Sequence, residues 1–243
     1  MQDIEKRVKN YWTNRVHDFS TVRRNELKAP ISGRWMEEMN HYLPKNRKLD
    51  ILDVGTGTGY FAVLLAKQGH RLTGIDLTFA MLNEAAVFAS LQGVEISFIP
   101  MDAQRLDFLS ASFDAVVTRN LTWTLPDPET AYAEWRRVLR PGGVLLNFDA
   151  NYGNNVRNNQ KKKSHDPQGC VYGHCGITPE MKKENAAITL SMSISYKKRP
   201  EWDVECLRRC GFAECGCDES AGQRILRDKD LADAPLFLAW AKA

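Results

Sequence analysis

A glycine-rich segment, Asp53 to Gly59, carries the clearest chemical signal in the sequence. It reads DVGTGTG, follows the apolar run Leu49 to Val54 and precedes a helix-like run, Tyr60 to Lys67. Glycines between a strand and a helix permit a tight turn and let a ligand approach the backbone where a Cβ would obstruct it. The position therefore favours a nucleotide-binding loop over a tight turn without a ligand.

Two further observations narrow the ligand. A dinucleotide-binding loop of the G-x-G-x-x-G type needs glycine where this sequence has Tyr60, so the spacing disfavours NAD and a nucleotide-dependent oxidoreductase. Asp76 ends the next apolar run, in GIDLT, and a carboxylate there can accept hydrogen bonds from both hydroxyls of a ribose. Asp76 could instead cap the following helix. Because Thr78 is better placed for that role, we favour the ligand role for Asp76.

The elements around these residues follow a regular order. Short apolar runs alternate with helix-like stretches, which predicts parallel β-α-β units, and the continuous apolar character of the runs predicts a sheet buried on both faces. The sequence therefore predicts a doubly wound α/β fold. The predicted strands are 49–54, 71–75, 95–99, 113–118 and 144–148.

The flanking segments depart from this rhythm. The first 45 residues are predicted to be helical, because apolar residues recur there every three or four positions. Residues 151–200 begin as a polar, asparagine-rich stretch, and 177–198 then predict a short helix and a strand. The chain closes with a predicted helix over 202–210 and a final strand over 235–242.

Length, net charge and the distribution of apolar residues narrow the class of protein. A length of 243 residues suits one domain better than two, and 33 basic against 30 acidic residues leave a net charge of +3, too small to indicate nucleic acid or a membrane surface. No apolar run approaches the roughly 20 residues that span a bilayer, and the charged N-terminus lacks the apolar core of a signal peptide. We expect a soluble, cytoplasmic protein.

Five motifs occur in one order over roughly residues 48–150: DVGTGTG, GIDLT, PMDAQRL, SFDAVVTRN and LRPGG. In this order they resemble the motifs of class I S-adenosylmethionine (SAM)-dependent methyltransferases. The resemblance implies SAM as cofactor and a seven-stranded, mostly parallel sheet with an antiparallel last strand. Within a single domain, 1–243, it implies an N-terminal helical lid (1–45), a SAM-binding core (48–150), a substrate-side insertion after strand five (151–200) and a C-terminal completion of the sheet (201–243).

The resemblance also implies roles along the cofactor. Asp53 would orient the glycine loop or the cofactor's amino group, and Asp76 would bind the ribose hydroxyls. The loop residues that would surround the methionine part are Gly55, Thr56, Gly57 and Gly59.

The remaining implied contacts concern adenine and the acceptor side. Leu77 and Met81 would lie against adenine, Asp102 would bind its amino group, and Ala103 would offer its backbone. Asn120 would contact the cofactor through its main chain and face the acceptor. Asp102 could otherwise be an ordinary loop aspartate.

The N-terminal helix adds one candidate. In similar methyltransferases this helix can fold over the cofactor, and Tyr11 lies off the apolar stripe that contains Trp12. We therefore expect Trp12 to pack in the core and Tyr11 to contact the cofactor.

No motif assigns a catalytic residue. Methyl transfer needs a nucleophile aligned with the departing sulfur, and a base only where the acceptor holds its proton tightly. Open α/β sheets bind ligands at the carboxyl ends of their strands. The residues expected to face the acceptor are therefore Asn120, Trp123, Asp149, Asn151 and Tyr152, although Trp123 could be a core aromatic. The catalytic candidates are Asn120, Tyr152 and His174, for which a plain surface histidine is the alternative.

Two motifs that the sequence lacks narrow the class of acceptor. After strand four the chain reads RNLTW, without the Asn/Asp-Pro-Pro-aromatic run of enzymes that methylate amino groups of adenine, cytosine or glutamine, and without a Pro-Cys pair. We therefore expect a small-molecule acceptor, with no nucleic acid or membrane partner. A SAM-binding module without transfer activity is the alternative.

All six cysteines fall within residues 170–217. Their spacings fit no structural zinc pattern, so no metal site is predicted, and Cys206 and Cys210 suit an apolar helix face. In a second interpretation Cys170, Cys175 and Cys215 or Cys217 bind a thiophilic metal or metalloid, as in a thiol or metalloid methyltransferase.

Overall fold

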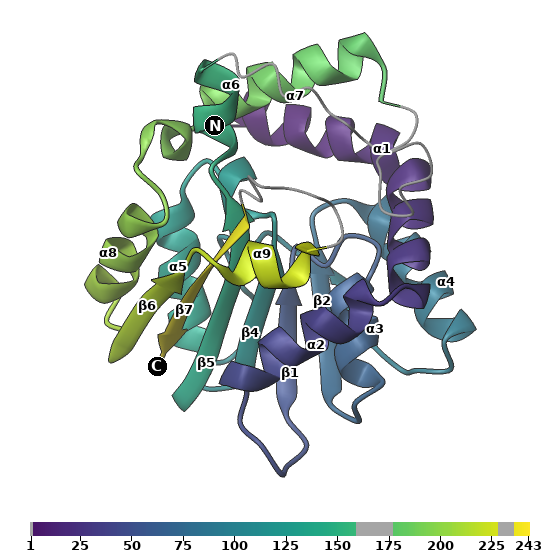
Figure 1. Ribbon diagram of the computed structural model, residues 1–243, viewed down its shortest axis with the longest axis vertical. Coiled ribbons are helices and arrows are strands. Elements are labelled where there is room, and N and C mark those ends of the chain that lie inside the picture. The colour runs from purple at the N-terminus through teal and green to yellow at the C-terminus, as the bar shows by residue number, and fades with distance from the viewer. Residues whose placement is uncertain (1, 159–176, 228–235) are drawn as a thin grey trace.

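The computed structural model describes residues 2–158, 177–227 and 236–243. These residues form one seven-stranded sheet and the helices around it (Figure 1). The strand order is β3-β2-β1-β4-β5-β7-β6. Strand β7 runs antiparallel to both β5 and β6, and the other neighbouring pairs are parallel. The predicted fold class is therefore confirmed. The strands are β1 Asp50–Val54, β2 Arg71–Asp76, β3 Ser97–Pro100, β4 Phe113–Arg119, β5 Leu139–Ala150, β6 Glu214–Asp218 and β7 Leu236–Lys242.

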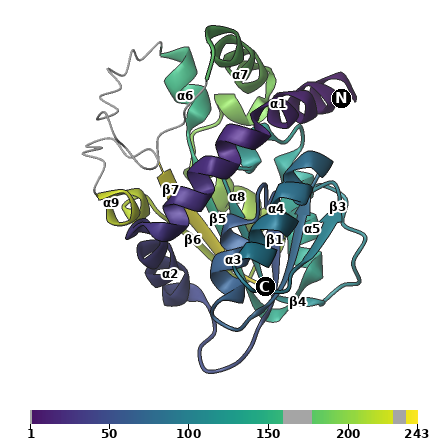
Figure 2. The same cartoon turned by 90° about the vertical axis from the view of Figure 1, so that its right-hand side faces the viewer.

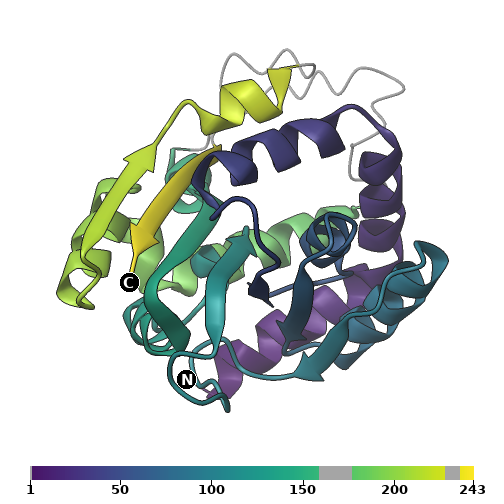
Figure 3. The same ribbon diagram turned by 90° about the horizontal axis from the view of Figure 1, so that it is seen from below.

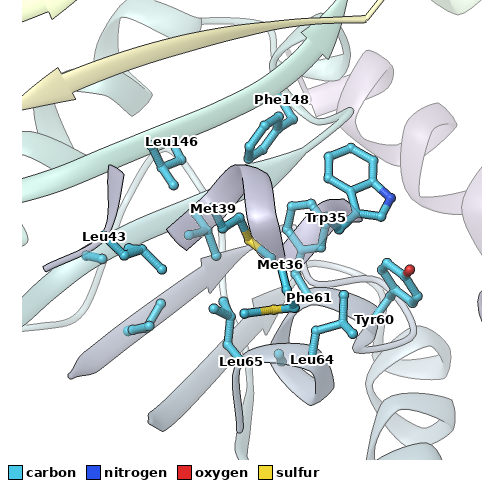
Figure 4. Packing of buried hydrophobic residues seen from close by; sticks show 14 of the residues in the cluster. Trp35, Met36, Met39, Leu43, Tyr60, Phe61, Leu64, Leu65, Leu146 and Phe148 are labelled. Atoms are coloured by element: carbon cyan, nitrogen blue, oxygen red, sulfur yellow. The ribbon is translucent and has the colours of Figure 1, made fainter. Parts of the chain in front are cut away.

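Helices cover both faces of the sheet (Figure 3). On one face α2 (Ile31–Tyr42), α3 (Tyr60–Ala66) and α9 (Ala221–Ile225) pack on the sheet. Figure 4 shows this packing, in which Trp35 of α2 lies edge-on against Phe61 of α3 and Phe148 of β5. On the other face lie α5 (Pro128–Val138) and α8 (Glu201–Arg209). None of the helices in the described ranges has both the length and the apolar character that a bilayer crossing requires.

A helical layer lies above the carboxyl ends of the strands. The long helix α1 (Gln2–Lys28) packs beside α7 (Pro179–Ser191), as Figures 1 and 2 both show. Arg7 pairs with Glu184 at 3.0 Å across these two helices, and Arg24 of α1 pairs at 3.1 Å with Glu84 of α4 (Phe79–Leu91). The predicted helical N-terminus is therefore confirmed, and α1 and α7 together are called the lid helices below.

The segment 177–198 differs in part from its prediction. The helix expected near 177–198 is present as α7, which begins where the Thr178 hydroxyl accepts the Met181 N–H at 3.2 Å. The strand expected after it is wrong. The chain instead forms the 3-10 turn η2 (Ser193–Tyr196), because the Ser195 hydroxyl donates to the Thr189 carbonyl at 2.6 Å and holds the segment against α7.

One strand boundary and one whole strand were also missed. Strand β5 begins at Leu139 rather than at the predicted 144, and a register shift against β4 absorbs the irregular backbone around the Pro-Gly-Gly sequence. Strand β6 has the sequence ECGCD, which carries no apolar run. It forms because β7 pairs with it along its full length.

Helix α6 (Tyr152–Arg157) packs closely on η2 at Gly153. A Cβ at Gly153 would lie 2.3 Å from the Ser195 carbonyl oxygen. We expect Gly153→Ala to lower the free energy of unfolding by about 1–3 kcal/mol, because backbone must shift to admit the methyl group. Urea denaturation measures the change, with Gly33→Ala as control, since no atom lies within 4 Å of the methyl group added there. Equal effects of the two substitutions would contradict the prediction.

Candidate functional site

The glycine loop joins β1 to α3 and uses backbone angles that favour glycine. The φ angles of Gly55, Gly57 and Gly59 are +67°, +54° and +83°. A Cβ at Gly55 would lie 2.7 Å from the side chain of Leu121, so the loop packs tightly against the segment after β4. A Cβ at Gly59 would lie 3.0 Å from Ala85 of α4. Gly59 therefore serves helix packing, whereas Gly55 and Gly57 line the adjacent cavity.

Asp53 holds the two ends of this loop together. Its carboxylate accepts the Thr56 hydroxyl at 2.6 Å and the Ala62 N–H at 3.1 Å. The side chain is only 2% exposed, and burial raises its pKa to about 7 against the opposing effect of these hydrogen bonds. Of the two roles implied for Asp53, these contacts fit the orientation of the glycine loop.

This raised pKa has a measurable consequence for stability. Because the folded protein holds the Asp53 proton more tightly than the unfolded chain, this group makes the free energy of unfolding fall as pH rises from about 4 to about 7. In Asp53→Asn that fall should be smaller. Urea denaturation at several pH values in this window tests it, with the exposed Glu37→Gln as control. A slope equal to that of the original protein would contradict it.

Asp76 ends β2 beside the loop. Its two carboxylate oxygens accept the N–H groups of Gly57 at 3.0 Å and Thr78 at 2.8 Å. Thr78 is the N-cap residue of α4, but its side chain donates and accepts no capping hydrogen bond there, so the side-chain cap that we expected is absent. Burial raises the pKa of Asp76. The Thr78 side chain also hydrogen-bonds to this carboxylate. Because a carboxylate has about four lone-pair sites, it can still accept a hydrogen bond from a ligand.

A cavity of about 320 Å³ lies between these strand ends and the lid helices. It is large enough for part of a nucleotide-sized ligand. Gly59 is the one predicted cofactor residue that does not line it. The predicted residues that do are Tyr11, Asp53, Gly55, Thr56, Gly57, Asp76, Leu77, Met81, Asp102, Ala103 and Asn120.

The loop after β3 is held by its own polar contacts. Asp102 accepts the backbone N–H of Gln104 at 2.9 Å, and the Ala103 carbonyl accepts the Trp135 indole N–H at 2.9 Å. On the same part of the cavity wall Met81 is buried and Leu77 is 40% exposed. The loop therefore offers a carboxylate beside apolar surface, which suits a planar base with an amino group.

Asn120 has a strained backbone and an unpaired side-chain atom. Its φ is +55°, its N–H donates to the Phe148 carbonyl at 2.7 Å, and its carbonyl accepts the Trp123 indole N–H at 2.9 Å. Its main chain is thus already engaged, which leaves the N–H no role toward the cofactor. The backbone carbonyl keeps a second lone pair, and the buried side-chain oxygen has no hydrogen-bond partner among the described residues, so both oxygens are available to a ligand.

Tyr152 packs against Trp123, with ring centroids 4.8 Å apart, and both line the cavity. Burial raises the pKa of Tyr152. The phenol is therefore protonated at neutral pH and is a hydrogen-bond donor rather than a base. His174, the third catalytic candidate, lies outside the described residues.

Tyr11 differs from its predicted environment. We expected it off the apolar face of the N-terminal helix, but it is only 7% exposed and packs with Ile188 and Met192 beside the α7 helix. Its hydroxyl accepts a hydrogen bond from Arg15 at 2.8 Å. Trp12 is partly buried and lines the cavity as well, so both aromatic residues form its lid wall.

Three cavity-lining arginines were not predicted: Arg15, Arg23 and Arg119. Arg23 and Arg119 share Glu26, at 2.6 and 2.9 Å. Although burial opposes ionisation, the two guanidinium groups lower the pKa of Glu26 to about 2, so it is charged at neutral pH. The sequence feature that could have indicated these arginines is the polar run VRRNE within an otherwise amphipathic helix.

Asp149 lies behind the cavity rather than in it. It is fully buried and accepts the Trp123 backbone N–H at 3.1 Å and the Thr122 hydroxyl. Arg199 joins it, at 3.1 Å, to the equally buried Asp203 at 2.8 Å. The expectation that Asp149 faces the acceptor is therefore wrong. It fixes the 3-10 turn η1 (Thr122–Thr124), which carries Trp123 into the cavity wall.

The described cysteines lie on the C-terminal elements. Cys206 of α8 is buried in the core, Cys210 and Cys215 are half-buried, and Cys217 is exposed. Within the described ranges, no three His, Cys, Asp or Glu side chains are arranged to hold a metal ion. Cys170 and Cys175 lie outside those ranges.

Comparison with known proteins matches residues 52–147 to the family described as "Methyltransferase domain". The chain is 29% identical over 153 residues to a ubiquinone biosynthesis O-methyltransferase of Histophilus somni, covering 60% of each protein. It is 39% identical over 98 residues to a demethylmenaquinone methyltransferase of Thermus thermophilus, covering 40% of this chain and 44% of that one. The chain thus spans about half the length of these curated relatives.

One solved structure with the same fold is phosphoethanolamine N-methyltransferase 2 of Haemonchus contortus in complex with SAM. The TM-score is 0.60 at 18% identity, over 86% of this chain and 52% of that one.

Proposed function

We propose, on the premise that residues 52–147 of this chain are a class I SAM-dependent methyltransferase domain, that the protein transfers the methyl group of SAM to a small-molecule acceptor. The observation that carries the proposal is the cavity at the carboxyl ends of β1, β2 and β4, which collects the residues expected to bind SAM. Bound there, SAM supplies an electrophilic methyl group. Residues 1–45 and 151–200 would enclose the acceptor.

The residues present fit this cofactor. Asp76 would accept the two ribose hydroxyls, and Asp102 the amino group of adenine. Gly55 and Gly57 leave room for the methionine part, and Asp53 keeps the loop in shape. The unpaired buried side-chain oxygen of Asn120 supports a polar ligand group in this cavity.

The acceptor side favours positioning over proton removal. Asn120 would accept a hydrogen bond from the acceptor, and Tyr152 would donate one. Among the described residues that line the cavity there is no histidine. We therefore propose an acceptor whose nucleophilic atom needs no strong base, held near attack distance in the partly enclosed cavity under the lid helices.

Calorimetry with SAM, its demethylated product S-adenosylhomocysteine and NADH tests the cofactor. We expect both sulfur compounds to bind and NADH not to bind, and tight NADH binding without SAM binding would overturn the proposal. Incubation with methyl-labelled SAM and a metabolite extract then separates a transferase from a SAM-binding module. Binding without any labelled product would favour the module.

A further inference from the structure

The cavity wall under the lid helices is positively charged. The wall at the ends of β1 to β3 carries Asp53, Asp76 and Asp102, whereas the wall made by the lid helices and the end of β4 carries five cations and one acid. The cations are Lys9, Arg15, Arg23, Arg119 and Lys182, and the acid is Glu5.

Two acids behind this wall compensate only part of the charge. Asp18 pairs with Arg15 at 2.9 Å, and the single carboxylate of Glu26 serves both Arg23 and Arg119. Counting only these named residues, five cations stand against Glu5, Asp18 and Glu26, which leaves two positive charges. The buried Arg15 and Arg23 act strongly on a ligand because little water screens them, whereas the exposed Lys9 and Lys182 act on it at close range.

The cofactor can neutralise one of these two charges. The Arg23 guanidinium lies 4.5 Å from the Phe19 ring centroid, and that ring would lie 3.4 Å from a Cβ on Gly57. Arg23 is therefore beside the glycine loop, where the methionine carboxylate of SAM would lie. One positive charge then remains, and the positive sulfonium of SAM adds to it.

We propose that the methyl acceptor is an organic acid whose carboxylate or phosphate is bound by Lys9 of α1 and Lys182 of α7. This inference rests on the proposed function and names its substrate class. The uncharged part of the acceptor lies against the aromatic wall made by Trp12, Trp123 and Tyr152. The two lysines are exposed and belong to separate lid helices, so the acid also links α1 to α7 over the cavity.

Calorimetry on the full chain tests this proposal. The protein is first saturated with S-adenosylhomocysteine, so that the carboxylate subsite of the cofactor is filled and no transfer occurs. Benzoate and phenyl phosphate are then titrated as acids, with benzamide and phenol as their neutral counterparts. We expect at least one acid to bind about tenfold more tightly than its neutral counterpart, as charge-assisted hydrogen bonds would provide. The acid with the larger preference identifies carboxylate or phosphate as the recognised group.

Two matched double variants test whether the preference for the acid depends on Lys9 and Lys182. Lys9→Gln with Lys182→Gln should abolish the preference for the acid, while Lys6→Gln with Lys183→Gln should keep it. All four lysines are exposed on the same two helices, but Lys6 and Lys183 do not line the cavity. Both double variants should bind S-adenosylhomocysteine, which shows that they are folded.

Three outcomes would overturn the inference: equal binding of acids and neutral counterparts, no binding of either acid, and acid binding that occurs only when S-adenosylhomocysteine is absent. The last outcome would assign the positive wall to the cofactor's own carboxylate. Failure to bind either SAM or S-adenosylhomocysteine would instead refute the proposed function, so the two failures are distinguishable.

Discussion

Replacing Arg199 with methionine is expected to lower the free energy of unfolding by about 3–5 kcal/mol. Arg199 joins two carboxylates, Asp149 and Asp203, that have no exposure to solvent. Methionine fills similar space but supplies no charge, so both acids would remain buried without their common partner. Because Asp149 also holds the Trp123 N–H, the variant should loosen the acceptor wall as well.

The loss of unfolding free energy in Arg199→Met should depend on pH. Burial already raises the pKa of Asp149 while Arg199 opposes that rise, so removing Arg199 raises the pKa further. A higher folded-state pKa makes stability fall as pH rises, and the variant should therefore lose more at pH 7 than at pH 5. Urea denaturation at both values measures this.

A control for Arg199→Met lies nearby. Arg209→Met removes an exposed ion pair with Glu129, at 3.0 Å, and should change stability by less than about 1 kcal/mol. Comparable losses in the two variants, or a loss at Arg199 that does not change with pH, would contradict the expected result.

Asp76→Ala should weaken SAM binding by about 1–3 kcal/mol, or roughly five- to 150-fold in the dissociation constant. The substitution removes the proposed acceptor for the ribose hydroxyls and also frees the N–H groups of Gly57 and Thr78, which shape the loop. Calorimetry with SAM measures the change. Asp107→Ala removes an exposed acid that does not line the cavity and should leave affinity unchanged. Unchanged affinity in Asp76→Ala would remove Asp76 from the site.

The grouping of Asp53, the glycine loop and Asp76 around one cavity could be predicted from the sequence. Asp53, the loop glycines and Asp76 stand at the ends of neighbouring apolar strands, and parallel pairing brings those ends together. Their spacing thus determines their place in the fold.

The surroundings of Tyr11, Asp149 and Asn120 could not be predicted in the same way. Tyr11 is buried because α7, more than 160 residues later, packs against it, and Asp149 is removed from the cavity by Arg199. The main-chain N–H and carbonyl of Asn120 form hydrogen bonds with Phe148 and Trp123. Each of these outcomes depends on a partner distant in the chain or on a local backbone angle, and neither leaves a periodic pattern.

The lid helices come from opposite sides of the recognised domain in sequence. The family match spans residues 52–147, α1 ends at Lys28, and α7 begins at Pro179. Helix α2 and strands β6 and β7, which also lie outside the matched segment, are part of the core and the sheet, so the lid helices are the outside elements that leave the sheet intact when they change. If the lid helices contact the acceptor as proposed, exchanging α1 and α7 for those of a relative is expected to change which acceptor is methylated.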